Sequence, residues 1–169
     1  MSPGLHPFLA ALAVAAMCVT AAAAAKRPSD RWNYYRFDGR TFVAGRPTDG
    51  TAFVAVRDGV RPVVLTGAGK IEPVALGAGM GAIAGICYIQ SSGGKLADAS
   101  GYTPCPRLPL EISANGRVAG TLETDEQGYF VATLPAGRYR VTGRATVEVT
   151  VENGTTTLVP LRAGKRMAD

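Results

Sequence analysis

Residues 124–141 constrain the fold of this chain more than any other segment, because two turn signals and two alternating strands follow one another directly. Residues 125–128, D-E-Q-G, predict a tight turn, and residues 129–134 alternate as a half-buried strand does. Residues 135–137, P-A-G, predict a reversal of the chain, and residues 138–143 alternate again. Short strands separated by Gly and Pro at this spacing are typical of an antiparallel sandwich and not of an α/β fold. We therefore expect an all-β protein.

The rest of the C-terminal half continues this pattern of strands and turns. Asn115-Gly116 and Asn153-Gly154 are dipeptides that favour two-residue hairpin turns. In residues 146–151, Val alternates with Glu and Thr, which gives the strand one apolar and one polar face. We predict seven strands joined as a series of hairpins, in residues 82–90, 108–114, 117–124, 129–134, 138–143, 146–151 and 155–162.

The order of these motifs resembles the carboxypeptidase regulatory-like domains, over residues 81–163. The family signature runs roughly G–T–x-T-D-x-x-G-x-F–x-x-L-P-x-G-x-Y–x-V, and residues 120–141 read G-T-L-E-T-D-E-Q-G-Y-F-V-A-T-L-P-A-G-R-Y-R-V. The resemblance implies a seven-stranded, transthyretin-like Greek-key sandwich that acts as an accessory or interaction module and is not catalytic. One departure is that the family's short T-G-x-P-L-x-G segment is replaced by a longer, Cys-bearing loop in residues 91–107. We expect that region to be remodelled.

The N-terminal residues 1–25 have the pattern of a signal peptide. Residues 5–19 are an apolar run of the usual length, and residues 21–25 are the small side chains that a signal peptidase needs. We place cleavage after Ala25, although the run is preceded by no Lys or Arg. Cys18 follows Met17 where a lipoprotein would have a small residue, which disfavours a lipid anchor. We expect an exported protein, in the periplasm, on the cell surface or secreted.

Loss of this leader would also remove His6, the only histidine. Without histidine, the mature chain has no Ser-His or Cys-His nucleophilic pair and no histidine-ligated metal site. The acidic residues Glu123, Asp125 and Glu126 share one turn, but they lack the alternating oxygen ligands of a calcium loop. We therefore expect no enzyme activity, no cofactor and no metal.

The charge pattern disfavours nucleic acid as a partner. The net charge is +5, and the 18 basic residues are spread along the chain, often alternating with apolar residues as in Arg138-Tyr-Arg140. A nucleic-acid interface would gather its basic residues into a patch. A solvated sheet face is the favoured interpretation, and weak attraction to anionic envelope polymers is the alternative.

Two cysteines, Cys87 and Cys105, remain in the mature chain. An even number of cysteines in an exported protein predicts a disulfide. Closing the loop of 19 residues between positions 87 and 105 would stabilise the fold by about 3 kcal/mol. The alternative is a pair of inert, buried thiols.

Residues 26–80 carry no motif that points to a family. Strands are expected in residues 42–44, 52–56 and 62–65, with a linker at residues 66–70. Residues 74–89 carry no charge and contain three glycines spaced four residues apart. The same spacing of small residues occurs in packed membrane helices. That run is shorter than the roughly 20 residues of a membrane span, so we favour a glycine-rich linker followed by a strand. We divide the mature chain into a β-rich extension with linker, 26–80, and a sandwich, 81–169.

An aromatic cluster, Trp32, Tyr34, Tyr35 and Phe37, lies near the start of the mature chain. Aromatic residues beside Arg are enriched at interfaces and sugar-binding platforms. The other interpretation is an N-terminal strand whose rings fill the core of a small β-domain. The predicted function is an exported, non-enzymatic module that binds or assembles with another envelope protein, with no stable membrane span. The alternative is a carbohydrate-binding module that uses this aromatic cluster on a surface glycan.

Overall fold

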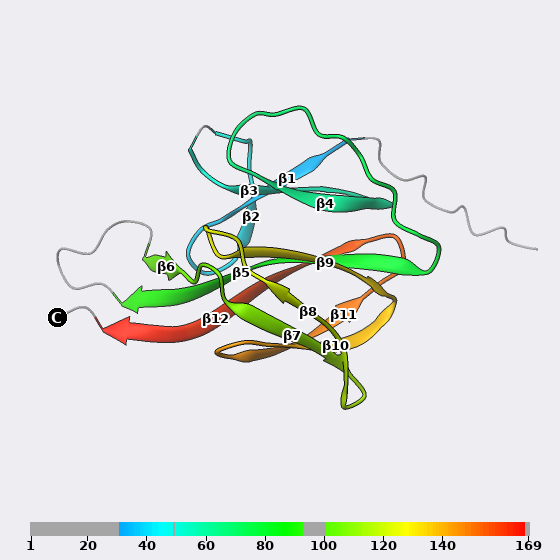
Figure 1. Ribbon diagram of the computed structural model, residues 1–169. Coiled ribbons are helices and arrows are strands. Elements are labelled where there is room, and N and C mark those ends of the chain that lie inside the picture. Colours follow the sequence, from blue (N-terminus) through cyan, green and yellow to red (C-terminus); the bar gives the residue numbers. More distant parts are fainter. Residues whose placement is uncertain (1–30, 49, 93–100, 168–169) are drawn as a thin grey trace, which may run out of the picture.

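All regular secondary structure in the described part of the chain is β-strand (Figure 1). The structure is a computed structural model, and it describes residues 31–48, 50–92 and 101–167. The predicted all-β class is therefore confirmed. The predicted signal peptide, residues 1–25, lies outside the described residues. Within them, no helix is long and apolar enough to cross a membrane.

In the described residues, twelve strands form three sheets, which we call A, B and C. Sheet A has the order β2 (Phe42–Ala44), β1 (Asn33–Phe37), β3 (Phe53–Arg57), β4 (Val60–Leu65). Sheet B has the order β12 (Thr156–Met167), β5 (Met80–Ser92), β6 (Tyr102–Pro104), and β9 (Tyr129–Pro135) also pairs with β5. Sheet C has the order β11 (Thr146–Val151), β10 (Gly137–Thr142), β7 (Pro109–Ala114), β8 (Arg117–Glu123).

Strand β5 lies at the centre of the molecule because both of its faces are buried. Ile83 and Cys87 belong to the core between sheets B and C. Ala84, Ile86 and Tyr88 alternate with them and belong to the core between sheets A and B. Successive side chains of a strand point to opposite faces, so sheet B is the middle layer and sheets A and C cover its two sides (Figure 1).

The pairing of β12 with β5 is parallel and extends from Thr156↔Ala82 to Met167↔Ser92. The other pairings between strands are antiparallel in the described residues. Parallel neighbours need a long crossover connection, and here the chain passes through the strands of sheet C before β12 returns beside β5. The last predicted strand therefore closes sheet B rather than extending sheet C.

All seven predicted strands of the C-terminal half are present, but the prediction of a continuous series of hairpins was wrong. Strands β7 and β8 pair through the 115–116 turn, and β10 and β11 pair directly. The turns at residues 135–137 and 153–154 instead lead from one sheet to the other, because β9 and β12 belong to sheet B while β10 and β11 belong to sheet C. A turn motif reverses the chain locally, and the next strand pairs with whichever neighbour buries its apolar face.

The strands expected in residues 42–44, 52–56 and 62–65 correspond to β2, β3 and β4. The linker after β4 runs partly beside this strand, because Arg61 N–H donates to Val74 O at 2.8 Å and Leu76 N–H donates to Gly59 O at 2.9 Å. The uncharged segment 74–89 is this linker followed by β5, as the favoured interpretation predicts.

Candidate interaction surfaces

Phe37, the last residue of the predicted aromatic cluster, lies in the core and not on the surface. Its side chain is 5% exposed. The centroid of its ring is 4.6 Å from that of Tyr88 and 4.9 Å from that of Tyr102. Because β1 is an inner strand of sheet A, its inward side chains pack against sheet B. Phe37 therefore joins two layers of the fold and offers no surface to a partner.

The other three aromatic residues are half-buried. The guanidinium of Arg57 lies 5.4 Å from the centre of the Trp32 ring, in a cation–π arrangement. Tyr34 meets Phe53 edge to face, with ring centroids 5.5 Å apart. Tyr35 pairs with Val54 of β3 within the sheet. The rings thus have partners inside sheet A, and their use as a sugar platform stays a prediction.

The two cysteines lie opposite each other at the junction of β5 and β6. The register of Tyr88 with Pro104 continues to Cys87 and Cys105, and Cys105 N–H donates to Cys87 O at 2.9 Å. Both side chains are buried. Burial, and then a hydrogen bond to the Cys105 side chain, raises the pKa of the Cys87 thiol to about 12. Both are free thiols in this structure, so the disulfide stays a prediction.

The acidic turn at residues 125–128 has a structural role. Asp125 Oδ1 accepts hydrogen bonds from the backbone N–H groups of Gln127 and Tyr129, each at 2.8 Å. Gly128 N–H donates to Asp125 O at 3.0 Å, which closes the turn. Glu126 lies on the surface and forms an ion pair with Arg107, with 3.4 Å between Oε1 and Nε. In the described residues, no group of acidic or Cys side chains is arranged to hold a metal.

Strand β8 is an open edge of sheet C. It pairs with β7 and with no other described strand. Each of its seven residues is exposed or half-buried, and Val118 keeps 59% of its surface exposed. Charged residues stand only at its ends, Arg117 and Glu123. An uncharged edge strand with free backbone groups is a template for another strand.

The edges on the opposite side of the sandwich are less open. Strand β12 contains Pro160, which has no N–H to offer, and its register shifts between Arg162 and Gly164. On β11, the carbonyl of Thr150 accepts a hydrogen bond from the Thr157 hydroxyl at 2.8 Å. Proline and bulges are the features that disfavour strand addition at an edge. Strand β8 also has a bulge, because its register with β7 skips Ala119, but it contains no proline and each of its residues is exposed or half-buried. The part of β8 beyond the bulge, residues 120–123, is therefore the better docking edge.

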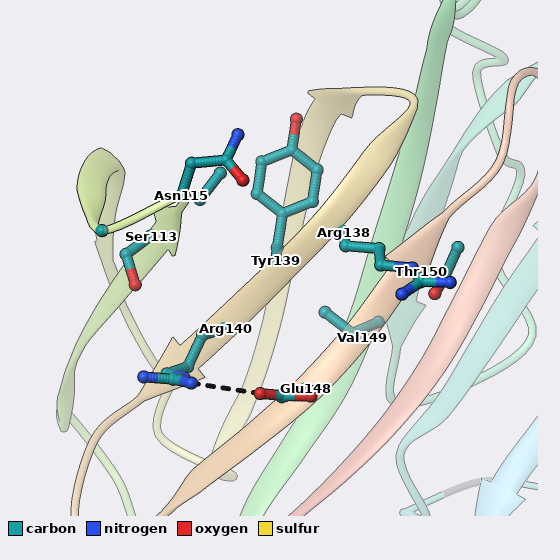
Figure 2. Close-up of a pocket in the computed structure, with 10 residues that line it drawn as sticks. Ser113, Asn115, Arg138, Tyr139, Arg140, Glu148, Val149 and Thr150 are labelled. Carbon is teal, nitrogen blue, oxygen red and sulfur yellow. Dashed lines mark hydrogen bonds and ion pairs between the residues drawn. The ribbon is translucent and has the colours of Figure 1, made fainter.

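A polar groove of about 430 Å³ lies on sheet C (Figure 2). It is lined by residues 113–116 at the β7–β8 turn, by residues 138–140 of β10 and by residues 148–150 of β11. Arg140 forms an ion pair with Glu148, with 3.1 Å between Nη2 and Oε1. The Tyr139 hydroxyl donates to Pro135 O at 2.8 Å. From the sequence, the alternation of Arg138 and Arg140 favours a solvated face, with weak attraction to anionic polymers as the alternative, because the residues opposite them depend on strand pairing.

Comparison with known proteins gives little information on function. No protein-family model matches the chain, and no curated protein matches it. The resemblance to carboxypeptidase regulatory-like domains is thus not supported by a family match, although the β-sandwich that it implies is present. One similar solved structure is a minor pilin of the gram-positive pathogen Streptococcus agalactiae, with 15% identity and a TM-score of 0.40. The match covers 76% of this chain and 66% of the pilin chain.

Proposed function

We propose that this protein is an exported, non-enzymatic β-sandwich module that binds another protein of the cell envelope by accepting a strand of that partner at β8. The observation that carries the proposal is the open edge of β8, a seven-residue strand without Pro or Lys. In strand addition, main-chain hydrogen bonds supply affinity, and side chains on alternate positions supply specificity.

Backbone geometry indicates which groups of β8 would bind the added strand. Just beyond β8, Thr124 N–H points toward the preceding strand and donates to Leu108 O at 3.0 Å. Backbone groups alternate in direction along an antiparallel strand. The N–H groups of Glu123 and Thr121 therefore point to the free edge, where a partner's carbonyl groups would accept their hydrogen bonds.

The side chains of β8 fit such a partner. The centre of the strand, residues 118–122, is V-A-G-T-L, which presents no charge that an approaching backbone would have to desolvate. The exposed Val118 offers apolar contact. The absence of histidine from residues 26–169 and the resemblance to accessory domains support a binding module over an enzyme. We also propose residues 81–169 as the binding module and residues 26–80 as its extension.

Substitution of Thr121 tests this proposal. Thr121→Pro removes the outward N–H without removing a hydrogen bond between β7 and β8. Chemical crosslinking in intact cells, followed by mass spectrometry, would identify the partner of the native protein. We expect recovery of that partner to fall about tenfold in the variant, since a hydrogen bond and the close approach of the strand are lost.

Thr121→Val is the matched control, because it changes the same exposed side chain and keeps the N–H. We expect it to recover the partner as the native protein does. Circular dichroism of both variants checks that the sandwich is intact. Equal recovery with a folded Thr121→Pro variant would contradict strand addition at β8.

A further inference from the structure

The two arginines of the sheet C groove are in different electrostatic environments. They are two residues apart on β10, so their side chains leave the same face of the sheet. Arg140 lies opposite Glu148 in the register with β11 and is neutralised by it. Arg138 lies opposite Thr150, which carries no charge. No ion pair of Arg138 is present in the described residues.

We infer that this groove binds an acidic sugar, whose carboxylate pairs with the Arg138 guanidinium. A carboxylate matches the planar fork of guanidinium donors, and such charge-assisted pairs are about twice as strong as neutral hydrogen bonds. The groove volume of about 430 Å³ is within the range of small-molecule sites, roughly 300–1,000 Å³.

The remaining lining favours a sugar over other anions. Ser113, Asn115 and Thr150 bring hydroxyl and amide groups that can donate to and accept from sugar hydroxyls. Figure 2 shows Arg138 beside Thr150 and the Glu148 carboxylate held by Arg140 in the same groove. That carboxylate would repel a doubly charged phosphate more than the singly charged acid group of one sugar residue.

This site differs in position from the edge proposed above, because β7 lies between β10 and β8 in the sheet and the groove touches only the turn before β8. The test is titration calorimetry of the leader-free chain with an oligogalacturonate, and with the corresponding neutral galactose oligomer, inorganic phosphate and a polyglutamate peptide. We expect binding of the oligogalacturonate, with at least tenfold weaker binding of the other three. Binding of none of them, or equal binding of the neutral sugar, phosphate or the peptide, would overturn the assignment.

Two pairs of variants locate the site. Arg138→Gln is expected to weaken oligogalacturonate binding about tenfold, the loss of one charge-assisted pair. Arg46→Gln removes the same charge from an exposed position just after β2, in sheet A's part of the chain, and is expected to have no effect. Equal weakening by both variants would show attraction to the net charge alone and overturn the site.

Glu148→Gln tests the groove with a variant that is expected to strengthen binding rather than weaken it. It releases Arg140 from its ion pair, so a second guanidinium becomes available and binding is expected to tighten about threefold. Glu72→Gln changes the net charge equally at an exposed position outside the groove and is expected to leave binding unchanged. Unchanged binding in Glu148→Gln would overturn the placement of the carboxylate beside these arginines.

Discussion

Gly85 shows, at the scale of single residues, how closely the elements around β5 approach one another. A Cβ at this position would overlap the end of the Phe130 ring and the backbone carbonyl of Val159. Phe130 belongs to the core between sheets B and C, and Val159 belongs to the parallel partner strand. Position 85 requires glycine, because the Phe130 ring occupies the space that a side chain at this position would need.

We predict that Gly85→Ala destabilises the protein by about 1–3 kcal/mol, the usual cost of overpacking a core. Urea unfolding followed by circular dichroism measures the change. Gly120→Ala is the control, since Gly120 lies in β8 and a Cβ there meets no atom within 4 Å. A loss of stability as large in Gly120→Ala would show that backbone freedom, and not the contact with Phe130, decides the cost.

At the scale of elements, Cys87 and Cys105 are placed to join β5 to the segment after β6. Residues directly opposite in an antiparallel pair have Cα atoms about 4.5–5.5 Å apart, within the range that a disulfide needs. We expect the exported protein to contain this disulfide and reduction to lower its stability by about 3 kcal/mol. Mass spectrometry after alkylation under denaturing conditions would detect it. Two alkylated cysteines in the exported protein would contradict it.

The reduced protein should also be sensitive to alkaline pH. The folded-state pKa of Cys87 is raised from 9.0 to about 12, so above pH 9 the unfolded chain loses this proton while the folded chain keeps it. Stability is therefore fully present below pH 9 and falls as the pH rises toward 12. The form with the disulfide has no thiol to titrate and does not lose stability in this way. Buried tyrosines such as Tyr129, whose pKa burial also raises, affect both forms equally. The difference in stability between the two forms at alkaline pH therefore reports on the thiol.

Elements also show what the sequence could and could not predict. Strands β9 and β10 were found because alternation and the P-A-G turn are local signals. The sequence did not predict that β9 and β10 belong to different sheets, because the partner of each strand is decided by strands distant in the chain, such as β5. The open edge of β8 depends on the order of strands in sheet C, and the unpaired charge of Arg138 depends on its register with Thr150. Neither is encoded within one segment.

At the scale of the whole molecule, strands β1 to β4 form a third layer, sheet A. The rings of Phe37 and Tyr88 join sheet A to sheet B, and Val54 lies in the same core. Without this cover, the face of β5 that carries Ala84 and Ile86 would be exposed to water. The aromatic run at residues 31–37 could be interpreted as an interface because a ring that fills a core and one that binds a partner look alike in sequence.

This arrangement predicts that all three layers unfold together. The fluorescence of Trp32, the only tryptophan, reports on sheet A, while circular dichroism reports on every strand, so the two urea transitions should coincide.

Phe37→Ala should lower stability by about 3–5 kcal/mol and move the fluorescence transition to a lower urea concentration than the circular dichroism transition. Tyr34→Ala, on the opposite face of β1, should cost less and leave the transitions coincident, because Tyr34 packs on Phe53 within sheet A. An earlier tryptophan transition in the native protein would instead mean that sheet A is a separate folding unit, since the apolar contact between Phe37 and Tyr88 would then be too weak to couple the layers.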